Sequence, residues 1–160
     1  MDTITSLAHD FLSQSSIAVV GISSSKQSVA NGICRKLRTT TRTVYAVGKN
    51  TASFEGEPCY PDLASLPNPV TGVFIATKPE NTGRIVDECV ALHIPRVWMH
   101  NMGGTSVSSG SSASIRAIEQ CRENNISVIP GACPMMFCQN ADTFHSCIKW
   151  FLKVTGKLKI

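Results

Sequence analysis

The sequence predicts a single α/β domain in which helices cover both faces of a parallel β-sheet. Two observations lead to this prediction. Short, wholly apolar runs that end at glycine, such as Ile17–Gly21, are typical of strands buried on both faces. Between these runs lie segments whose apolar residues recur with the period of an amphipathic helix. Because strands and helices alternate with short connections, we expect right-handed crossovers and a Rossmann-like, doubly wound sheet in three layers.

The predicted strands are apolar runs bounded by glycine, proline or polar residues. In chain order they are Ile17–Gly21, Thr43–Val47, Gly72–Ala76, Arg96–Met99 and Ile126–Ile129. The stretch from Glu57 to Pro69 holds four of the eight prolines. We therefore predict irregular structure there, with a single helical turn at Asp62–Leu66.

The predicted helices lie before, between and after these strands. Thr3–Leu12 carries apolar residues along one face. The hydroxyl of Ser28 is placed to cap the helix that follows the first strand, and Pro79 suits the first turn of another. A further helix, built on Ile115, Ile118 and Cys121, ends at Asn124-Asn125, and the glycine- and serine-rich stretch 101–112 before it predicts a loop.

The length and composition predict one domain over residues 1–160, with its core at about residues 14–138. A closing helix is expected at about residues 140–155, with Cys147 on its buried stripe. A chain of 160 residues can bury a substantial core, and 42% hydrophobic with 16% charged residues is ordinary for a globular protein. No apolar run approaches the roughly 18–20 residues that cross a bilayer, so we expect no membrane contact.

The net charge and the cysteine content argue against a nucleic-acid-binding protein and against a disulfide-rich secreted protein. The net charge is +4, from 15 basic and 11 acidic residues spread along the chain, which indicates at most a small anionic ligand and no nucleic-acid partner. Seven cysteines, an odd number without a C-x-x-C pair, do not suggest the disulfide framework of a secreted chain. We therefore predict buried thiols and a cytoplasmic protein. The four histidines are scattered, and no metal site is predicted.

The loop after the first strand is the main candidate site, because ligands of this fold bind beyond the carboxyl ends of the strands. It combines a glycine for a tight turn, several serine hydroxyls and a lysine, and it precedes a helix N-terminus that favours anions. We predict that it holds a pyrophosphate; the alternative is a serine-rich connector. The candidate residues are Gly21, Ile22, Ser23, Ser24, Ser25, Lys26 and Ser28.

The loop after the second strand distinguishes between nucleotides. The dinucleotide fingerprint G-x-G-x-x-G would need glycines near Ser23 and Lys26, and an acidic residue after the second strand would hold the ribose of NAD. Gly48 and Lys49 stand in that second place instead. A lysine suits a ribose that carries a phosphate, as in NADP or in the 3′-phosphate of coenzyme A. A solvated surface lysine is the alternative.

Two later loops add weaker candidates. The third strand is followed by Thr77, Lys78 and Pro79, which could form an apolar lip for an adenine or a pantetheine arm, although simple helix initiation explains a proline there as well. Cys133 and Pro134 follow the last strand, where a thiol could face a ligand or lie buried in the loop. No catalytic residue is predicted, because the sequence has no nucleophile elbow, no Walker A loop and no paired carboxylates.

Taken together, the loop motifs resemble those of the coenzyme A-binding domain family, compact Rossmann proteins related to the first domain of the succinyl-CoA synthetase alpha subunit. The resemblance covers roughly residues 14–138. The segments that carry it are Ile17–Ser23, Tyr60–Leu63 before Leu66-Pro67, Val73–Glu80 and Val128–Met135.

The resemblance implies a role for each matching position. The first loop, Gly21 with Ser23–Lys26, would hold the pyrophosphate, and Lys49 would approach a phosphate of the coenzyme. Thr77–Pro79 would line the nucleotide and pantetheine, and Cys133-Pro134 would lie near the thiol end. The phosphohistidine of the synthetase belongs to a second domain that has no counterpart here, so the resemblance implies no ligase activity.

The predicted function is therefore the binding of coenzyme A, or of an acyl-CoA, without catalysis by this chain. One alternative is an NADP-binding oxidoreductase or redox-sensing domain. Others are a thiol-dependent carrier that links coenzyme A to Cys133, and an interaction domain with a vestigial pocket. A homo-oligomer or a protein partner is left open.

Overall fold

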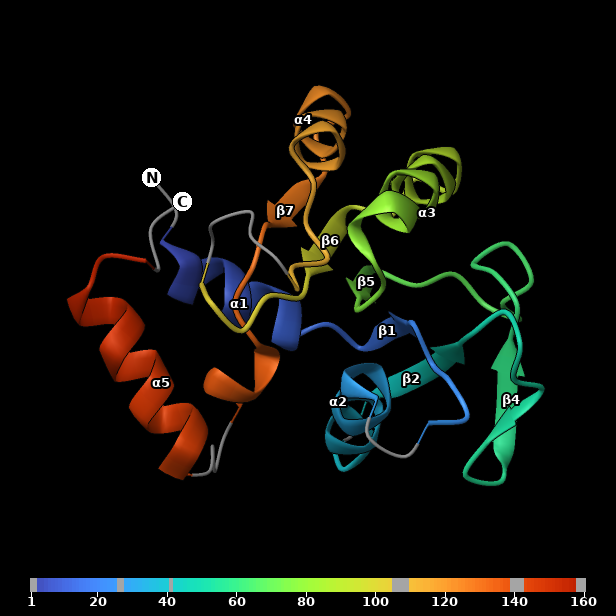
Figure 1. Cartoon of the computed structure of the whole chain (residues 1–160). Coiled ribbons are helices and arrows are strands. Elements are labelled where there is room, and N and C mark those ends of the chain that lie inside the picture. Colours follow the sequence, from blue (N-terminus) through green and yellow to red (C-terminus); the bar gives the residue numbers. More distant parts are fainter. Residues whose placement is uncertain (1–2, 26–27, 41, 105–109, 139–142, 158–160) are drawn as a thin grey trace.

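The first apolar run forms the central strand of the sheet, β1 (Ser16–Val20), in a computed structural model that describes residues 3–25, 28–40, 42–104, 110–138 and 143–157. Parallel neighbours flank β1 on both sides, β2 (Thr43–Val47) and β5 (Gly72–Ile75). Beyond β5 lie β6 (Arg96–Met99) and β7 (Ser127–Ile129), both also parallel. The sheet has seven strands in the order β3-β4-β2-β1-β5-β6-β7 (Figure 1).

The opposite edge of the sheet differs from the prediction. A short hairpin of β3 (Ser53–Phe54) and β4 (Glu57–Tyr60) occupies it, where the proline count predicted irregular structure from residue 57 onward. β4 pairs in parallel with β2 through Cys59 and Tyr60. A turn with positive φ at Glu55 and Gly56 closes the hairpin. Proline lacks an N–H donor but is tolerated near a sheet edge, so the prolines did not exclude this strand.

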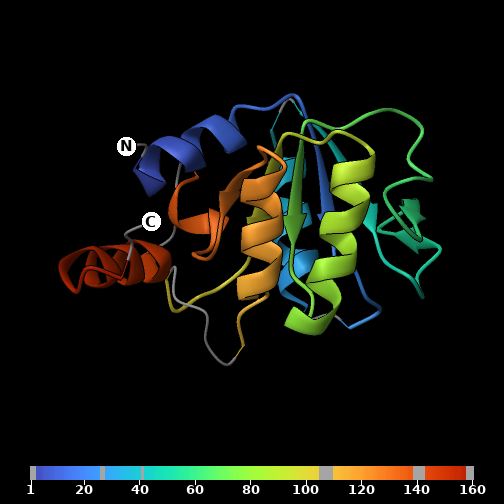
Figure 2. The same ribbon diagram turned by 90° about the horizontal axis from the view of Figure 1, so that it is seen from above.

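The helices cover the two faces as a doubly wound sheet requires, which confirms the predicted fold class. α3 (Pro79–Ala91) and α4 (Ile115–Glu123) lie on one face. The other face carries α1 (Ile4–Leu12), α2 (Val29–Arg38), the short 3-10 helix η1 (Pro134–Met136) and α5 (Thr143–Val154) (Figure 2). The predicted helix ends are confirmed where caps were expected: Ser28 caps α2, and Asn125 adopts φ 56° just after α4.

The central strands contribute side chains to two separate hydrophobic cores, one on each face of the sheet, because successive side chains of a strand point to opposite faces. In β1, Ile17 and Val19 enter the core under α1 and α2, whereas Ala18 and Val20 enter the core under α3 and α4. The first core contains Trp98, which is fully buried and meets Phe11 and Phe137 edge to face. Stacking of aromatic edges against faces adds about 0.5–1.5 kcal/mol per pair beyond area burial.

One predicted burial pattern is wrong. Cys147 is exposed, because α5 docks through Ile148 and Leu152, and Cys147 lies on the far side of the helix from Leu152. In α4, Ile118 and Cys121 reach the core, whereas Ile115 at the first position of the helix is 66% exposed. Among the residues that the structure describes, no helix is long and apolar enough to cross a bilayer.

Candidate functional site

The sheet order creates a crevice at the carboxyl end of β1. From β1 the chain proceeds to β2 on one side, and after β4 it crosses back to β5 on the other side. The connections after β1 and β5 therefore leave the sheet in opposite directions, and ligands of doubly wound folds bind at such a switch point. The predicted site residues after β1, β2 and β5 that the structure describes lie along this edge.

Gly21 allows the chain to turn at this point. Its φ is 117°, and a Cβ at this position would lie 2.4 Å from the carbonyl oxygen of Ala76, the residue after β5. The N–H groups of Gly21 and Ile22 both donate to the carbonyl of Val47 at 3.0 Å. The first two N–H groups of the loop therefore bind the sheet. Any ligand must use donors farther along the loop.

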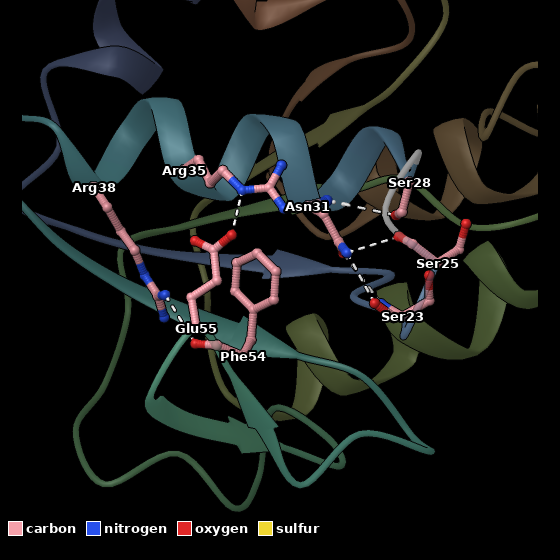
Figure 3. Close-up of polar contacts among 8 residues, drawn as sticks. All are labelled: Ser23, Ser25, Ser28, Asn31, Arg35, Arg38, Phe54 and Glu55. Carbon is pink, nitrogen blue, oxygen red and sulfur yellow. Dashed lines mark hydrogen bonds and ion pairs between the residues drawn. The ribbon is translucent and has the colours of Figure 1, made fainter.

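Asn31 holds those later residues in place, and the sequence analysis missed it. It is a buried residue of the first turn of α2, and its amide Nδ2 donates to the carbonyls of Ser23 (2.8 Å) and Ser25 (3.0 Å). Its Oδ1 accepts from the N–H of Ser23 at 3.2 Å, and its own N–H donates to the Oγ of Ser28 (Figure 3). A polar residue three positions after a capping serine was the only sequence signal.

The Asn31 contacts determine which groups of the loop a ligand can reach. In the described part of the loop, the N–H groups of Ser24 and Ser25 donate to no protein acceptor, and both residues are exposed. Ser23 is half-buried, and Ser28 lies at the N-terminus of α2. The loop thus combines two unused N–H groups, serine hydroxyls and a helix N-terminus, which is the usual construction of an anion site. Lys26 lies outside the described residues.

We expect that replacing Asn31 with alanine lowers the free energy of unfolding by about 2 kcal/mol, because it leaves the N–H and the carbonyl of Ser23 without partners and removes one of the two donors to the carbonyl of Ser25. Urea unfolding followed by circular dichroism measures this difference. Asn124→Ala is the matched control, since Asn124 is exposed and its side chain donates only to the carbonyl of Gln120. Equal losses in the two variants would contradict the role given to Asn31.

The C-terminal half of α2 contacts the β3–β4 hairpin. Arg35 pairs with Glu55, and the guanidinium groups of Arg35 and Arg38 lie 5.5 and 5.3 Å from the ring centroid of Phe54 (Figure 3). Arg38 also pairs with Glu57 at 3.0 Å. Helix α2 therefore connects the serine loop at its N-terminus with the hairpin that leads into β4.

A cavity of about 190 Å³ lies at the ends of β1, β2, β4 and β5, and we call it the carboxyl-edge cavity. It brings together several predicted residues: Gly21, Ile22, Gly48, Lys49 and Thr77. Position 48 requires a glycine because the backbone of Ile22 lies close to it: a Cβ there would be 2.2 Å from the carbonyl oxygen of Ile22. Lys78 and Pro79 are exposed at the start of α3 but do not line the cavity.

The sequence analysis missed the wall that α3 and the segment after β4 provide. Asn81, Arg84 and Glu88 line the cavity from α3, at positions one helical turn apart. Arg84 pairs with Glu88 at 2.7 Å, and the second oxygen of Glu88 accepts the N–H of Leu63 at 3.1 Å. This pair ties the 61–63 segment to α3. It also places a second cationic side chain in the same cavity as Lys49.

The predicted thiol end of the site is covered. Cys133 is 2% exposed, Pro134 is also buried, and neither lines the carboxyl-edge cavity. The Nε1–H of Trp98 donates to the carbonyl of Gly131 at 2.7 Å and fixes the backbone just before Cys133. The prediction that Cys133 meets a ligand therefore stays a prediction, and a ligand would have to displace core side chains to reach this thiol.

The helix cysteines behave as predicted. Cys34, Cys89 and Cys121 are buried, and burial raises the pKa of Cys34 to about 11 and that of Cys121 to about 12. Burial likewise raises the pKa of Cys89 well above its ordinary value. These thiols stay protonated at neutral pH and act as small hydrophobic side chains.

His100, just past β6, is a further residue that the sequence analysis missed. It is 8% exposed, its ring meets that of Phe74 edge to face, and its Nε2 has no hydrogen-bond partner in the described structure. Burial, with a smaller contribution from nearby His145, lowers the pKa of His100 to about 4. The imidazole is therefore neutral at physiological pH.

Comparison with known proteins agrees with this geometry. A family model described as a CoA binding domain matches residues 15–139. An ADP-forming acetate–CoA ligase of Archaeoglobus fulgidus is 34% identical over 73 residues, which make up 46% of this chain and 11% of the ligase. The match thus spans only a small part of that relative.

Solved structures show the same fold. A hypothetical protein from Pyrococcus horikoshii OT3 superposes with a TM-score of 0.73 at 21% identity, covering 84% of this chain and 88% of that chain. A dinucleotide-forming acetyl-coenzyme A synthetase of Candidatus Korarchaeum cryptofilum gives 0.62 at 18% identity, covering 78% of this chain and 27% of that one. Since the family model covers most of the sequence, the chain belongs to the CoA-binding domain family.

Proposed function

We propose that this chain binds coenzyme A, or an acyl ester of it, along the carboxyl edge of the sheet. The observation that carries the proposal is the carboxyl-edge cavity, in which Gly21, Gly48, Lys49 and Thr77 meet within a chain of the CoA-binding domain family. These residues come from the ends of three different strands. A shared ligand explains why their side chains and backbones converge on one cavity.

The size and the charges of the cavity suggest which part of the ligand it takes. At about 190 Å³ it is smaller than typical pockets for whole drug-sized ligands, so we assign it the phosphorylated nucleoside end. Lys49 then supplies positive charge for the 3′-phosphate, and Arg84 offers the guanidinium N–H groups that its pair with Glu88 leaves unused. Asp62 and Glu88 add carboxylates to the same lining. The pyrophosphate would lie at Ser24 and Ser25, beside the N-terminus of α2, where unused N–H groups favour an anion.

The proposal concerns binding, and catalysis by this chain is not part of it. The reaction of the acetate–CoA ligase belongs to that longer relative, of which the match spans 11%. The predicted NADP alternative draws no support from the family match or from these relatives. The cytoplasm remains the predicted location.

We expect coenzyme A to bind more tightly than dephospho-coenzyme A, by about 1–3 kcal/mol, because the charged contacts to the 3′-phosphate are lost in the second ligand. Titration calorimetry with coenzyme A, dephospho-coenzyme A and NADP measures the order of affinities. In Lys49→Ala the preference for coenzyme A should shrink. Lys153→Ala is the control, since Lys153 is an exposed lysine of α5 away from the cavity.

Two outcomes would overturn this assignment. Equal affinities of the wild-type protein for coenzyme A and its dephospho form would remove the role of Lys49 and Arg84. Tighter binding of NADP than of coenzyme A would replace the proposed ligand.

A further inference from the structure

We propose that the chain has a second ligand site, an amino-edge cavity that binds a small organic phosphate or carboxylate carrying hydroxyl groups. The cavity measures about 550 Å³ and lies where α1 and α2 end, beside the residues that follow η1. Its lining residues Ser13 and Thr40 lie three positions before the first residues of β1 and β2, Ser16 and Thr43. It therefore opens at the amino ends of these strands, across the sheet from the carboxyl-edge cavity.

The charge of the amino-edge cavity is the first support for this proposal. His9, Lys36 and Arg42 line it, and no carboxylate does among the described residues. In the described structure every ion pair involves another arginine, at Arg35, Arg38, Arg84 or Arg96. Lys36 and Arg42 are half-buried, yet neither has a carboxylate within 4 Å among the residues that the structure describes.

Two half-buried cations that no described carboxylate pairs with favour an anion between them. The helix dipole explains one of the two cations, because Lys36 lies in the last turn of α2, where the dipole favours positive charge. Arg42 lies beyond the end of α2, so the dipole explains it less well. Partial burial strengthens the attraction of both cations for a charged ligand.

The hydroxyl groups of the wall indicate the rest of the ligand. Ser13 Oγ donates to the carbonyl of Asp10 (2.7 Å), Thr39 Oγ1 to that of Lys36 (2.7 Å) and Thr40 Oγ1 to that of Leu37. Each hydroxyl thus donates its hydrogen to a backbone carbonyl at the C-terminal end of the helix that precedes it. The hydroxyl oxygens keep lone pairs that can accept, so they suit a ligand that carries hydroxyl donors beside its anionic group.

Cys138 provides a natural reporter inside this cavity. It lines the cavity and is half-buried, and burial raises the pKa of its thiol while the positive charges of Lys36 and Arg42 oppose that rise. Cys147 on α5 is exposed and does not line the cavity, so it serves as an internal reference in the same molecule.

The test compares a negatively charged alkylating agent with a neutral one. Wild-type protein is labelled with iodoacetate or with iodoacetamide, and mass spectrometry of the peptides gives the labelling rate of Cys138 and of Cys147. We expect the iodoacetate-to-iodoacetamide ratio to be roughly threefold higher at Cys138, as a modest charge attraction would give. The ratio should fall to that of Cys147 in the double variant Lys36→Gln/Arg42→Gln, and Arg122→Gln on α4 should leave it unchanged.

The second arm uses the unaltered protein, so it does not depend on how a variant folds. Glycerol 3-phosphate and citrate should slow the labelling of Cys138 by iodoacetamide without slowing that of Cys147, whereas glycerol should slow neither. Protection by only one of the two anions would identify the ligand as a phosphate or as a carboxylate.

Three results would overturn the proposal: no protection by either anion, equal protection by glycerol, or protection that survives in Lys36→Gln/Arg42→Gln. The protection of Cys138 by the two anions is measured again with coenzyme A present. If the two cavities are separate sites, coenzyme A at the carboxyl-edge cavity should leave this protection unchanged. Failure of coenzyme A to bind would not alter the expected protection, so the two proposals fail independently.

Discussion

Replacing Gly21 with alanine is expected to lower the free energy of unfolding by about 4 kcal/mol or more. Two effects add: the φ of 117° is one that residues with a Cβ rarely adopt, and the new methyl group would lie 2.4 Å from the carbonyl oxygen of Ala76. The carbonyl belongs to the backbone after β5, so it cannot move aside as a flexible side chain would. The variant should also lose affinity for coenzyme A, because the crevice lies at this contact.

The matched control is Gly32→Ala. Gly32 lies within α2, and a Cβ there would have no atom within 4 Å. Alanine should raise the stability by about 0.5–1 kcal/mol at this position, since glycine is unfavourable inside a helix. Urea unfolding of both variants gives the two differences. Similar stability of Gly21→Ala and the wild-type protein would show that the turn after β1 tolerates a side chain.

The second large effect concerns the pH dependence of stability. The pKa of His100 is lowered from 6.5 to about 4 by burial and by nearby His145, so unfolding at pH 5 requires uptake of a proton at this residue. The stabilising effect of the neutral imidazole is fully present above pH 6.5 and is lost as the pH falls from 6.5 toward 4. The linkage relation gives a loss of about 3 kcal/mol over that interval.

Replacement of His100 with phenylalanine should remove this part of the pH dependence. The new ring keeps an aromatic group against Phe74 and eliminates the buried Nε2 that has no hydrogen-bond partner in the described structure. At pH 7 the variant should therefore be as stable as the wild-type protein or slightly more stable. His9→Gln, at an exposed position on α1, should leave the slope unchanged. Parallel stability curves for the wild type and His100→Phe between pH 7 and pH 4 would contradict the assignment.

The fold was largely predictable because its signals are local. Ile17–Gly21 and Gly72–Ala76 are apolar without interruption, as strands buried on both faces must be, and they became β1 and β5. The hairpin β3–β4 was not predictable in the same way. Its strands are short and their pairing with β2 is a contact between distant segments, so prolines and polar residues dominated the local pattern.

The candidate site was predictable only in part. Gly21, Gly48 and Lys49 could be found because each follows a strand, and the carboxyl ends of parallel strands share one edge. Arg84 and Glu88 carried no such signal, since charged residues on a helix are ordinary surface features. Asn31 was missed because its role depends on the direction of its amide toward Ser23 and Ser25.

The sequence by itself determined the order of the elements outside the β3–β4 hairpin, the cap at Ser28, the end of α4 at Asn124-Asn125 and the placement of the candidate site at the carboxyl ends of the strands, because each depends on residue type and short spacing. Only the tertiary structure decided which thiols are accessible. Cys133, for which contact with a ligand and burial in the loop were both open, is buried, whereas Cys147, predicted on a buried stripe, is exposed on α5. Periodicity identifies the apolar stripe of a helix, but the partner across the interface decides which part of that stripe is covered.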